Sequence, residues 1–194
     1  MSETSHSLLE RLRVQPNDAL WNRLIDLYTP LLQKWLRRHF LLEADAEDLV
    51  QDVLAVLVRE LPHFEHNGQP GAFRRWLRTI LVHRLQGFWR ARQGRPLATG
   101  DSDLAKQFEQ LEDPASGLSQ LWDSEHDRHV MGRLLEQIEP QVAPSTWQAF
   151  RRVVLDGKDE EVVAKELGLS VNAVFIAKSR ILARLRREAQ GLID

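Results

Sequence analysis

Residues 74–95 read RRWLRTILVHRLQGFWRARQGR and contain seven arginines, two tryptophans and no acidic side chain. Apolar side chains recur in this stretch at intervals of three and four residues, which is the pattern of a helix that packs one face against a core. The stretch therefore predicts a helix from about Ala72 to Arg92. The apolar stripe of this helix comprises Trp76, Leu77, Ile80, Leu81, Leu85 and Phe88.

The opposite face of this predicted helix carries only basic and uncharged side chains. A carboxylate there would repel phosphate groups, so the absence of acids favours a surface that binds a polyanion. A solvated arginine-rich face is the alternative interpretation. Arg84 falls near the apolar stripe, and we expect it to reach toward solvent or to pair with an acid of a neighbouring helix. The outer face comprises Arg75, Thr79, His83, Gln86 and Arg90, with Arg74, Arg78 and Arg92 on its flank.

Helical periodicity extends over the rest of the chain, and no segment shows the alternation of a β-strand. The sequence therefore predicts an all-α protein. Asn17 or Asp18 is placed to cap one helix, and Asp45 to cap the next. Ser145 and Gln148 fit a capping box. In the second half of the chain we expect helices at about 127–138, 145–156, 159–167 and 171–189.

The composition is that of an ordinary globular protein, with 43% hydrophobic residues and a formal net charge of −2. The absence of cysteine excludes disulfides, thiolate metal sites and a cysteine nucleophile. There is no glycine-rich phosphate loop, and no histidine stands at ligand spacing beside Asp48 and Asp52. We therefore predict no enzyme activity, no metal and no cofactor. The N-terminal residues lack the pattern of a signal peptide, and no apolar run approaches the roughly 20 residues of a membrane span, so we expect a cytoplasmic protein.

Charge is distributed unevenly along the chain. Residues 66–100 contain no acid, residues 101–139 contain ten acids, and residues 170–187 again contain none. Two basic blocks thus flank an acidic segment, which favours contact with a polyanion at both ends.

Domain organisation follows from the same distribution. Residues 96–125 combine proline, glycine, serine and acids with weak periodicity. We predict that they form a flexible linker between two small helical domains at 1–95 and 126–194.

The clearest motif is DEEVVAKELGLSVNAVFIAKSRILARLRRE, residues 159–188. Gly168 supplies a turn position that tolerates positive φ, and Ser170 is placed to cap the longer second helix. This is the spacing of a helix-turn-helix, whose second helix enters the major groove of DNA. An ordinary antiparallel helix pair is the alternative. The expected packing side comprises Val162, Val163, Ala164, Leu167, Leu169, Val171, Val174, Ile181 and Leu185, and the expected exposed side comprises Asn172, Ala173, Ile176, Ser179 and Arg180.

Three stretches in this order resemble the extracytoplasmic-function (ECF) group of bacterial sigma factors. They are DAEDLVQDVLAVLVRELPHF (45–64), GAFRRWLRTILVHRLQGFWRARQGR (71–95) and the helix-turn-helix. The similarity covers roughly residues 20–95 and 126–188. It implies two domains, sigma region 2 and sigma region 4, that bind core RNA polymerase and direct it to promoters. Region 2 would melt the −10 element and hold the exposed strand, and region 4 would read the −35 element as duplex.

The resemblance also implies partners and site residues. An acidic helix face would dock on the clamp helices of the polymerase β′ subunit, which suits a basic protein surface on electrostatic grounds as well. The β flap and an anti-sigma factor are further expected partners. The polymerase-binding residues would be Glu47, Asp48, Gln51 and Asp52. The −10 residues would be Phe64, Glu65, His66, Asn67, Arg75, Thr79, His83, Gln86 and Arg90, with core packing as the alternative role of Phe64. The −35 residues would be Ser170, Asn172, Ala173, Ile176, Lys178, Ser179 and Arg180.

Two positions depart from the pattern of the family. His83 stands where many members have asparagine, and residues 174–177 read Val-Phe-Ile-Ala where many members read Val-Lys-Ser-Arg. The preferred base and the −35 sequence are therefore not carried over. A two-domain transcriptional regulator that does not bind polymerase is the alternative function, and the acidic face argues against it.

Overall fold

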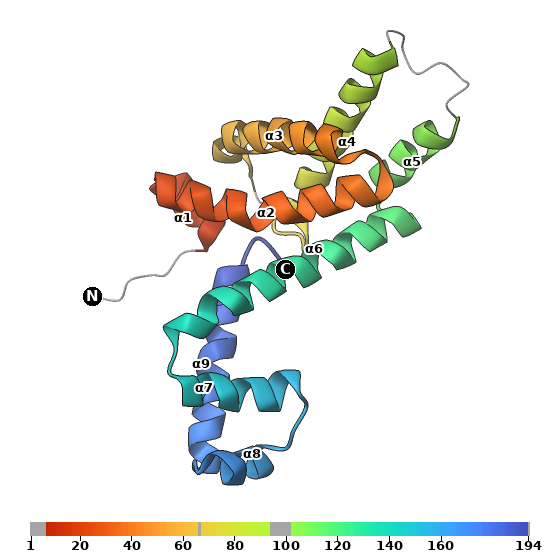
Figure 1. Ribbon diagram of the computed structural model, residues 1–194. Helices are drawn as coiled ribbons and strands as arrows, with labels where there is room; N and C mark the ends of the chain where they lie inside the picture. The colour runs from red at the N-terminus through yellow and green to blue at the C-terminus, as the bar shows by residue number, and fades with distance from the viewer. Residues whose placement is uncertain (1–6, 66, 94–101, 194) are drawn as a thin grey trace. The chain divides into compact units, whose positions relative to one another are not determined.

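The computed structural model describes residues 7–65, 67–93 and 102–193. Within these residues the chain forms helices and no strand, which confirms the predicted all-α class (Figure 1). The chain divides into two compact units. We call them the N-terminal unit, built mainly from Leu8–Val130, and the C-terminal unit, built mainly from Met131–Gln190.

The N-terminal unit is a group of helices around one apolar core. α2 packs on α3, α3 packs on α4, and α5 also packs on α4. The side chain of Asn17 accepts a hydrogen bond from the backbone N–H of Leu20 at 2.9 Å, which is the predicted cap of α2. The helices are α1 (Leu8–Val14), α2 (Asp18–His39), α3 (Glu43–Glu60), α4 (Ala72–Gln93), α5 (Ser102–Glu112) and the first part of α6 (Gly117–Ile138), with a 3-10 turn η1 (Leu61–His63) after α3.

The prediction that Asp45 caps α3 is wrong. The helix begins at Glu43, and its N-cap residue Leu42 makes no side-chain capping bond. Asp45 lies in the first turn, where a carboxylate is favoured by the positive end of the helix dipole. Its carboxylate forms an ion pair with Arg92 of α4. The acid therefore joins two helices instead of capping one.

Residues 96–125 were predicted to form a flexible linker, but most of the described residues among them are helical. Residues 96–101 of that segment lie outside the described part of the chain, but the remainder consists of α5 and the start of α6. Phe108, Leu111 and Trp122 are buried in the core of the N-terminal unit. The buried face of α6 also carries Ser119 and His126, so its stripe is not apolar throughout and its periodicity is hard to recognise. The predicted boundary at residue 126 therefore falls inside α6.

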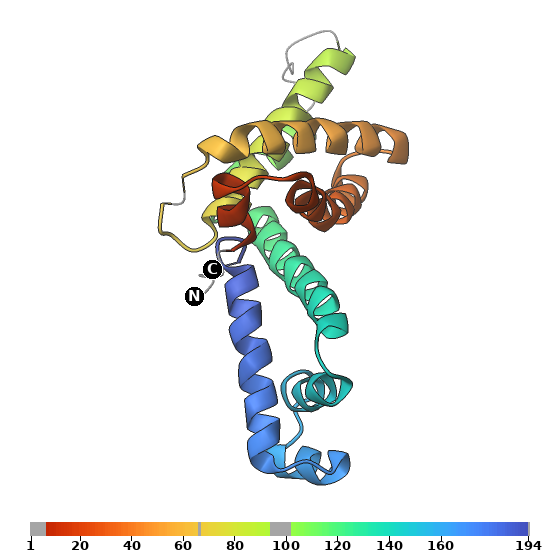
Figure 2. The ribbon, with the colours of Figure 1, turned by 90° about the vertical axis from the view of Figure 1, so that its left-hand side faces the viewer.

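The C-terminal unit contains the helix-turn-helix. Figure 2 shows α8 joined by a tight turn to the start of the long helix α9. Gly168 ends α8 in the left-handed conformation with φ 64°, and the Ser170 side chain accepts a hydrogen bond from the N–H of Ala173 at 3.1 Å, both as predicted. The unit contains the end of α6, the 3-10 turn η2 (Glu139–Gln141), α7 (Pro144–Phe150), the π-helical turn η3 (Arg151–Leu155), α8 (Glu160–Leu167) and α9 (Val171–Ala189).

Two local predictions about this unit are wrong. Ser145 does not cap α7, because the helix begins at Pro144 and no side chain caps it; proline is tolerated at this first position, where its missing N–H costs nothing. Val162 and Val171 are exposed although the helical pattern placed them on the packing side. One buried cluster of this unit comprises Ala149, Val163, Ala164, Val174 and Ala177, with Val153, Leu167 and Leu169 packed against it.

Candidate functional site

One face of α3 is acidic and exposed. Glu47, Asp48, Gln51 and Asp52 are all exposed, as their i, i+4 spacing on one side of a helix requires. The opposite side of the helix is buried in the core. The apolar stripe thus fixes the rotation of α3 and turns these four side chains outward. We call these four residues the acidic face.

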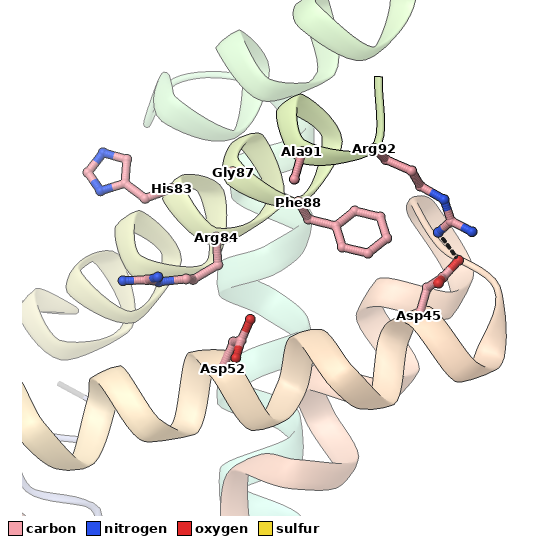
Figure 3. A pocket seen from close by; sticks show the side chains of 8 residues that line it. All are labelled: Asp45, Asp52, His83, Arg84, Gly87, Phe88, Ala91 and Arg92. Carbon is pink, nitrogen blue, oxygen red and sulfur yellow. Dashed lines mark ion pairs between the residues drawn. The ribbon is translucent and has the colours of Figure 1, made fainter. Parts of the chain in front are cut away.

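A groove of about 670 Å³ is lined by residues of α3 and α4. Figure 3 shows Asp52 on α3 and Arg84 on α4 along this groove, with the Asp45–Arg92 ion pair farther along it. Arg84 is exposed there, so it reaches solvent instead of the core. The groove therefore marks the place where an acidic helix surface gives way to a basic one. Its lining residues are Asp45, Asp52, His83, Arg84, Gly87, Phe88, Ala91 and Arg92.

Two arginines on the outer face of α4 donate hydrogen bonds to neutral groups. The guanidinium of Arg75 donates to Gln69 Oε1 at 3.3 Å and to the carbonyl of Pro70 at 3.1 Å. Arg90 Nε donates to the carbonyl of Gln86 at 3.2 Å. These partners are neutral, so both side chains retain their positive charge toward solvent. We call Arg75, Thr79, His83, Gln86 and Arg90 the basic face.

A second groove, of about 430 Å³, runs between the basic face and the end of α5. Arg75, Thr79 and His83 line one wall, while Leu111 and Glu112 line the other. The structure thus brings together three of the side chains predicted to contact the −10 element. Gln86, on the same face, donates from Nε2 to Glu112 Oε1 at 3.0 Å. An acidic side chain therefore borders this groove.

Two arginines on the flank of the basic face, Arg74 and Arg78, pair with acids of α6. Arg78 is only 4% exposed, and its Nη1 lies 3.2 Å from Asp123 Oδ1. Arg74 pairs with Asp127 at 2.6 Å and with Asp123 at 3.5 Å. Burial lowers the pKa of Arg78, and the nearby Asp123 carboxylate opposes that shift. These arginines hold α6 against α4 and do not face a ligand.

The sequence contains a signal for this pairing. Arg74 and Arg78 are spaced i, i+4 on one helix, and Asp123 and Asp127 are spaced i, i+4 on another. Two helices with such matched pairs present complementary charges along adjacent turns. The signal was missed because α6 was not predicted to begin before residue 127.

Next to this pairing lies a buried polar cluster. Tyr28 Oη is 3.1 Å from His126 Nε2, and His126 Nδ1 is 2.9 Å from Asp127 Oδ1. Burial lowers the pKa of His126, although the hydrogen bond to Asp127 acts in the opposite direction. Burial also raises the pKa of Tyr28, with a smaller contribution from Asp127. A neutral imidazole that donates from Nδ1 to the carboxylate and accepts at Nε2 from the tyrosine satisfies all three groups. The cluster is therefore a packed structural network.

The segment between α3 and α4 contains four of the residues predicted to contact the −10 element, Phe64, Glu65, His66 and Asn67. Phe64 is 9% exposed, with its ring centroid 4.7 Å from that of Trp76 and 5.7 Å from that of Phe73. Its stacking surface is thus occupied by core aromatics, in agreement with the alternative role of a core anchor. Glu65 and Asn67 are exposed, whereas His66 lies outside the described residues. The Asn67 side chain accepts a hydrogen bond from the N–H of Gln69 at 3.1 Å, which shapes the turn before α4.

The exposed face of α9 contains most of the residues predicted to contact the −35 element. Those that are exposed are Ser170, Asn172, Ile176, Ser179 and Arg180, while Ala173 and Lys178 are half-buried. Lys178 forms an ion pair with Glu160 of α8. Sequence reasoning missed Phe175, which is 52% exposed on the same face. Its exposure follows from the helical phase of the buried Val174 and Ala177 on either side of it.

A basic groove of about 480 Å³ lies between α9 and the start of α7. One wall of this groove carries three arginines from successive turns of α9, namely Arg180, Arg184 and Arg187. Arg184 also donates a hydrogen bond to the side chain of Gln141. A groove with three guanidinium groups suits a phosphate backbone, because arginine presents several donors with a fixed planar geometry.

Comparison with known proteins identifies part of this arrangement. Residues 24–95 match the family described as Sigma-70 region 2, a stretch that runs from within α2 through α4 and includes the acidic face, the loop and the basic face. No curated protein sequence matches the chain. Within the described residues, every helix is too short or too polar to cross a bilayer. The match shows that this stretch, which is mostly helical in the part that the structure describes, is similar to Sigma-70 region 2.

Proposed function

We propose that this protein is an ECF-type sigma factor that binds core RNA polymerase, recognises promoters, melts the −10 element and has no catalytic activity of its own. The match of residues 24–95 to Sigma-70 region 2 supports a role in polymerase binding and promoter recognition. One observation carries the proposal furthest. Within the matched stretch, α3 exposes an acidic face and α4 exposes a basic face.

The acidic face of α3 is the proposed polymerase surface. Glu47, Asp48, Gln51 and Asp52 would contact the clamp helices of the β′ subunit. Acidic groups repel DNA and attract a basic protein surface, so this face is unsuited to the promoter and suited to a protein partner. The C-terminal unit would act as region 4 and contact the β flap. An anti-sigma factor that covers these surfaces is a further proposed partner, and the cytoplasm is the proposed location.

The basic face of α4 is the proposed surface for the −10 element. Arg75 and Arg90 keep their charge toward solvent and would bind phosphates of the exposed strand. Thr79 and His83 line the groove beside Arg75, where an unstacked base would lie. Glu65 and Asn67 of the adjacent loop offer hydrogen-bonding groups, whereas Phe64 serves the core.

The helix-turn-helix is the proposed surface for the −35 element. Ser170 and the exposed residues of the first turns of α9 would face base edges in the major groove. Arg180 and the groove that it shares with Arg184 and Arg187 would hold the phosphate backbone. Lys178 would position its neighbours, because its ammonium group is already paired with Glu160.

A pull-down with core RNA polymerase, followed by transcription from a promoter library, tests the proposal. The native chain should bind polymerase and start transcription at a defined subset of promoters. The variant with Asp48→Arg and Asp52→Arg should fold but lose polymerase binding. Asp26→Arg with Glu109→Arg is the matched control, because both acids are exposed outside α3 and the net charge changes by the same amount. Undiminished binding of the α3 variant would contradict the assigned face, and failure of the native chain to bind would favour a regulator that acts without polymerase.

A further inference from the structure

The first two turns of α9 expose an unusual combination of side chains for a DNA-reading helix. Val171 is 45% exposed, Phe175 52% and Ile176 38%. Residues 171–177 contain no basic side chain, and Asn172 is the one side chain there with hydrogen-bonding groups; it is exposed. Val171 and Phe175 are spaced i, i+4, as are Asn172 and Ile176, so the four side chains form one continuous surface.

This surface is held in place from within the C-terminal unit. The Lys178 ammonium lies 5.6 Å from the centroid of the Phe175 ring. Lys178 is fixed in turn by its ion pair with Glu160 at the start of α8. A cation therefore lies over the Phe175 ring, while about half of the residue's surface is open to solvent. This contact limits the side-chain entropy that the ring loses on binding.

The charges around the surface favour DNA as its partner. No acid occurs on α9 between Val171 and Arg187, and Arg180, Arg186 and Arg187 are exposed on the same helix. On α8, Glu160 is neutralised by Lys178, and Glu166 pairs with Arg152 and Lys158. Asp159 and Glu161, at the start of α8, are also exposed acids. An apolar centre with a basic flank matches the major groove, where thymine methyl groups lie between rows of phosphates.

We propose that Phe175 and Ile176 read thymine methyl groups in the −35 element, and that Asn172 reads an adjacent adenine. The inference rests on the proposed function and deepens it, because it specifies an A·T-containing −35 sequence. Arginine or lysine is the usual reader of guanine, and none is present in the first two turns of this helix. Asparagine matches the N6 and N7 edge of adenine, and apolar side chains match the C5-methyl group of thymine.

The replacement of thymine by uracil provides a test, since it removes the methyl group and leaves every base-pairing group unchanged. Promoters would first be selected from a random library by transcription with the intact chain and core polymerase. The selected −35 region would then be resynthesised with deoxyuridine at one thymine at a time. We expect open-complex formation to weaken about fourfold for each contacted methyl, which corresponds to burial of one methyl-sized group. The variant Phe175→Ala with Ile176→Ala should bind thymine and uracil promoters equally well.

The matched control is Val154→Ala with Leu155→Ala, because these side chains are 38% and 50% exposed in the same unit but lie outside α9. This variant should still distinguish thymine from uracil. Transcription from promoters whose −35 region lacks thymine, or whose thymines tolerate uracil without loss, would overturn the inference and leave the proposed function standing. Absence of any promoter-directed transcription would reject the proposed function together with the inference.

Discussion

Replacement of Asp123 by alanine removes the carboxylate that Arg74 and Arg78 share. Arg74 retains Asp127 at 2.6 Å, so the larger effect falls on Arg78. That side chain is buried, and the acceptor left to it is the carbonyl of Ser119 at 3.5 Å. Removal of one partner from a buried ion pair costs about 3–5 kcal/mol, because the remaining charge is left without compensation. The Asp123 side chain is 27% exposed, so water reaches the site, and we expect the lower end, about 3 kcal/mol.

Equilibrium unfolding in urea, followed by tryptophan fluorescence, measures this loss. The signal reports mainly on the N-terminal unit, because every tryptophan except Trp147 lies there. With a slope of about 1–3 kcal/mol per molar urea, the midpoint should fall by roughly 1 M or more. Glu60→Ala is the control, since it removes a partner from the exposed Arg59–Glu60 pair and should cost under about 1 kcal/mol. Arg78→Met with Asp123→Leu should recover most of the stability, because no uncompensated charge remains. A loss from Asp123→Ala no larger than that from Glu60→Ala would refute the structural role of the pair.

Three further perturbations test the division between structural and functional groups. Arg75→Ala or Arg90→Ala should lower the slope of the logarithm of the promoter-binding constant against the logarithm of salt concentration by about one phosphate contact, whereas Arg78→Ala should destabilise the fold and leave this slope unchanged. Fluorescence anisotropy over a potassium chloride series measures the slope. Equal slopes for all variants would contradict the assigned face. Burial holds the pKa of His126 below its usual 6.5, so the unfolded chain binds the proton first as the pH falls. The contribution of His126 to the free energy of unfolding should therefore be complete above about pH 6.5 and should decrease below that pH. Burial also lowers the pKa of His39, so His39 acts in the same direction. Urea midpoints from pH 5 to 8 should show this fall, and His126→Gln should reduce it; an unchanged pH profile would argue against a neutral buried imidazole. Finally, Glu112→Gln should strengthen binding of the free chain to single-stranded DNA, because it removes a negative charge from the lining of the groove of Arg75 and His83. Unaltered affinity would show that this acid does not oppose the strand.

The amino-acid sequence by itself determined the features that depend on neighbouring residues. The apolar periodicity of residues 72–93 established α4 and its rotation, so the basic face could be assigned from spacing alone. Gly168 and Ser170 specified the turn and the start of α9 through backbone conformation and a capping bond. The outward direction of Asp48 on α3 likewise follows from the buried stripe beside it. In each case the cause lies within about one helical turn, where sequence spacing is a direct measure of geometry.

Only the tertiary structure decided which of these side chains remain available to a partner. Arg78 and Arg90 belong to the same arginine-rich helix, yet one is paired with Asp123 from α6 and the other faces solvent. Phe64 is a loop residue by sequence, but Trp76 and Phe73 cover its ring. These outcomes depend on contacts between segments that are far apart along the chain. The residue type of an arginine or a phenylalanine does not reveal whether a distant residue packs against it. Packing therefore selects the functional surface from a larger set of residues with suitable chemistry.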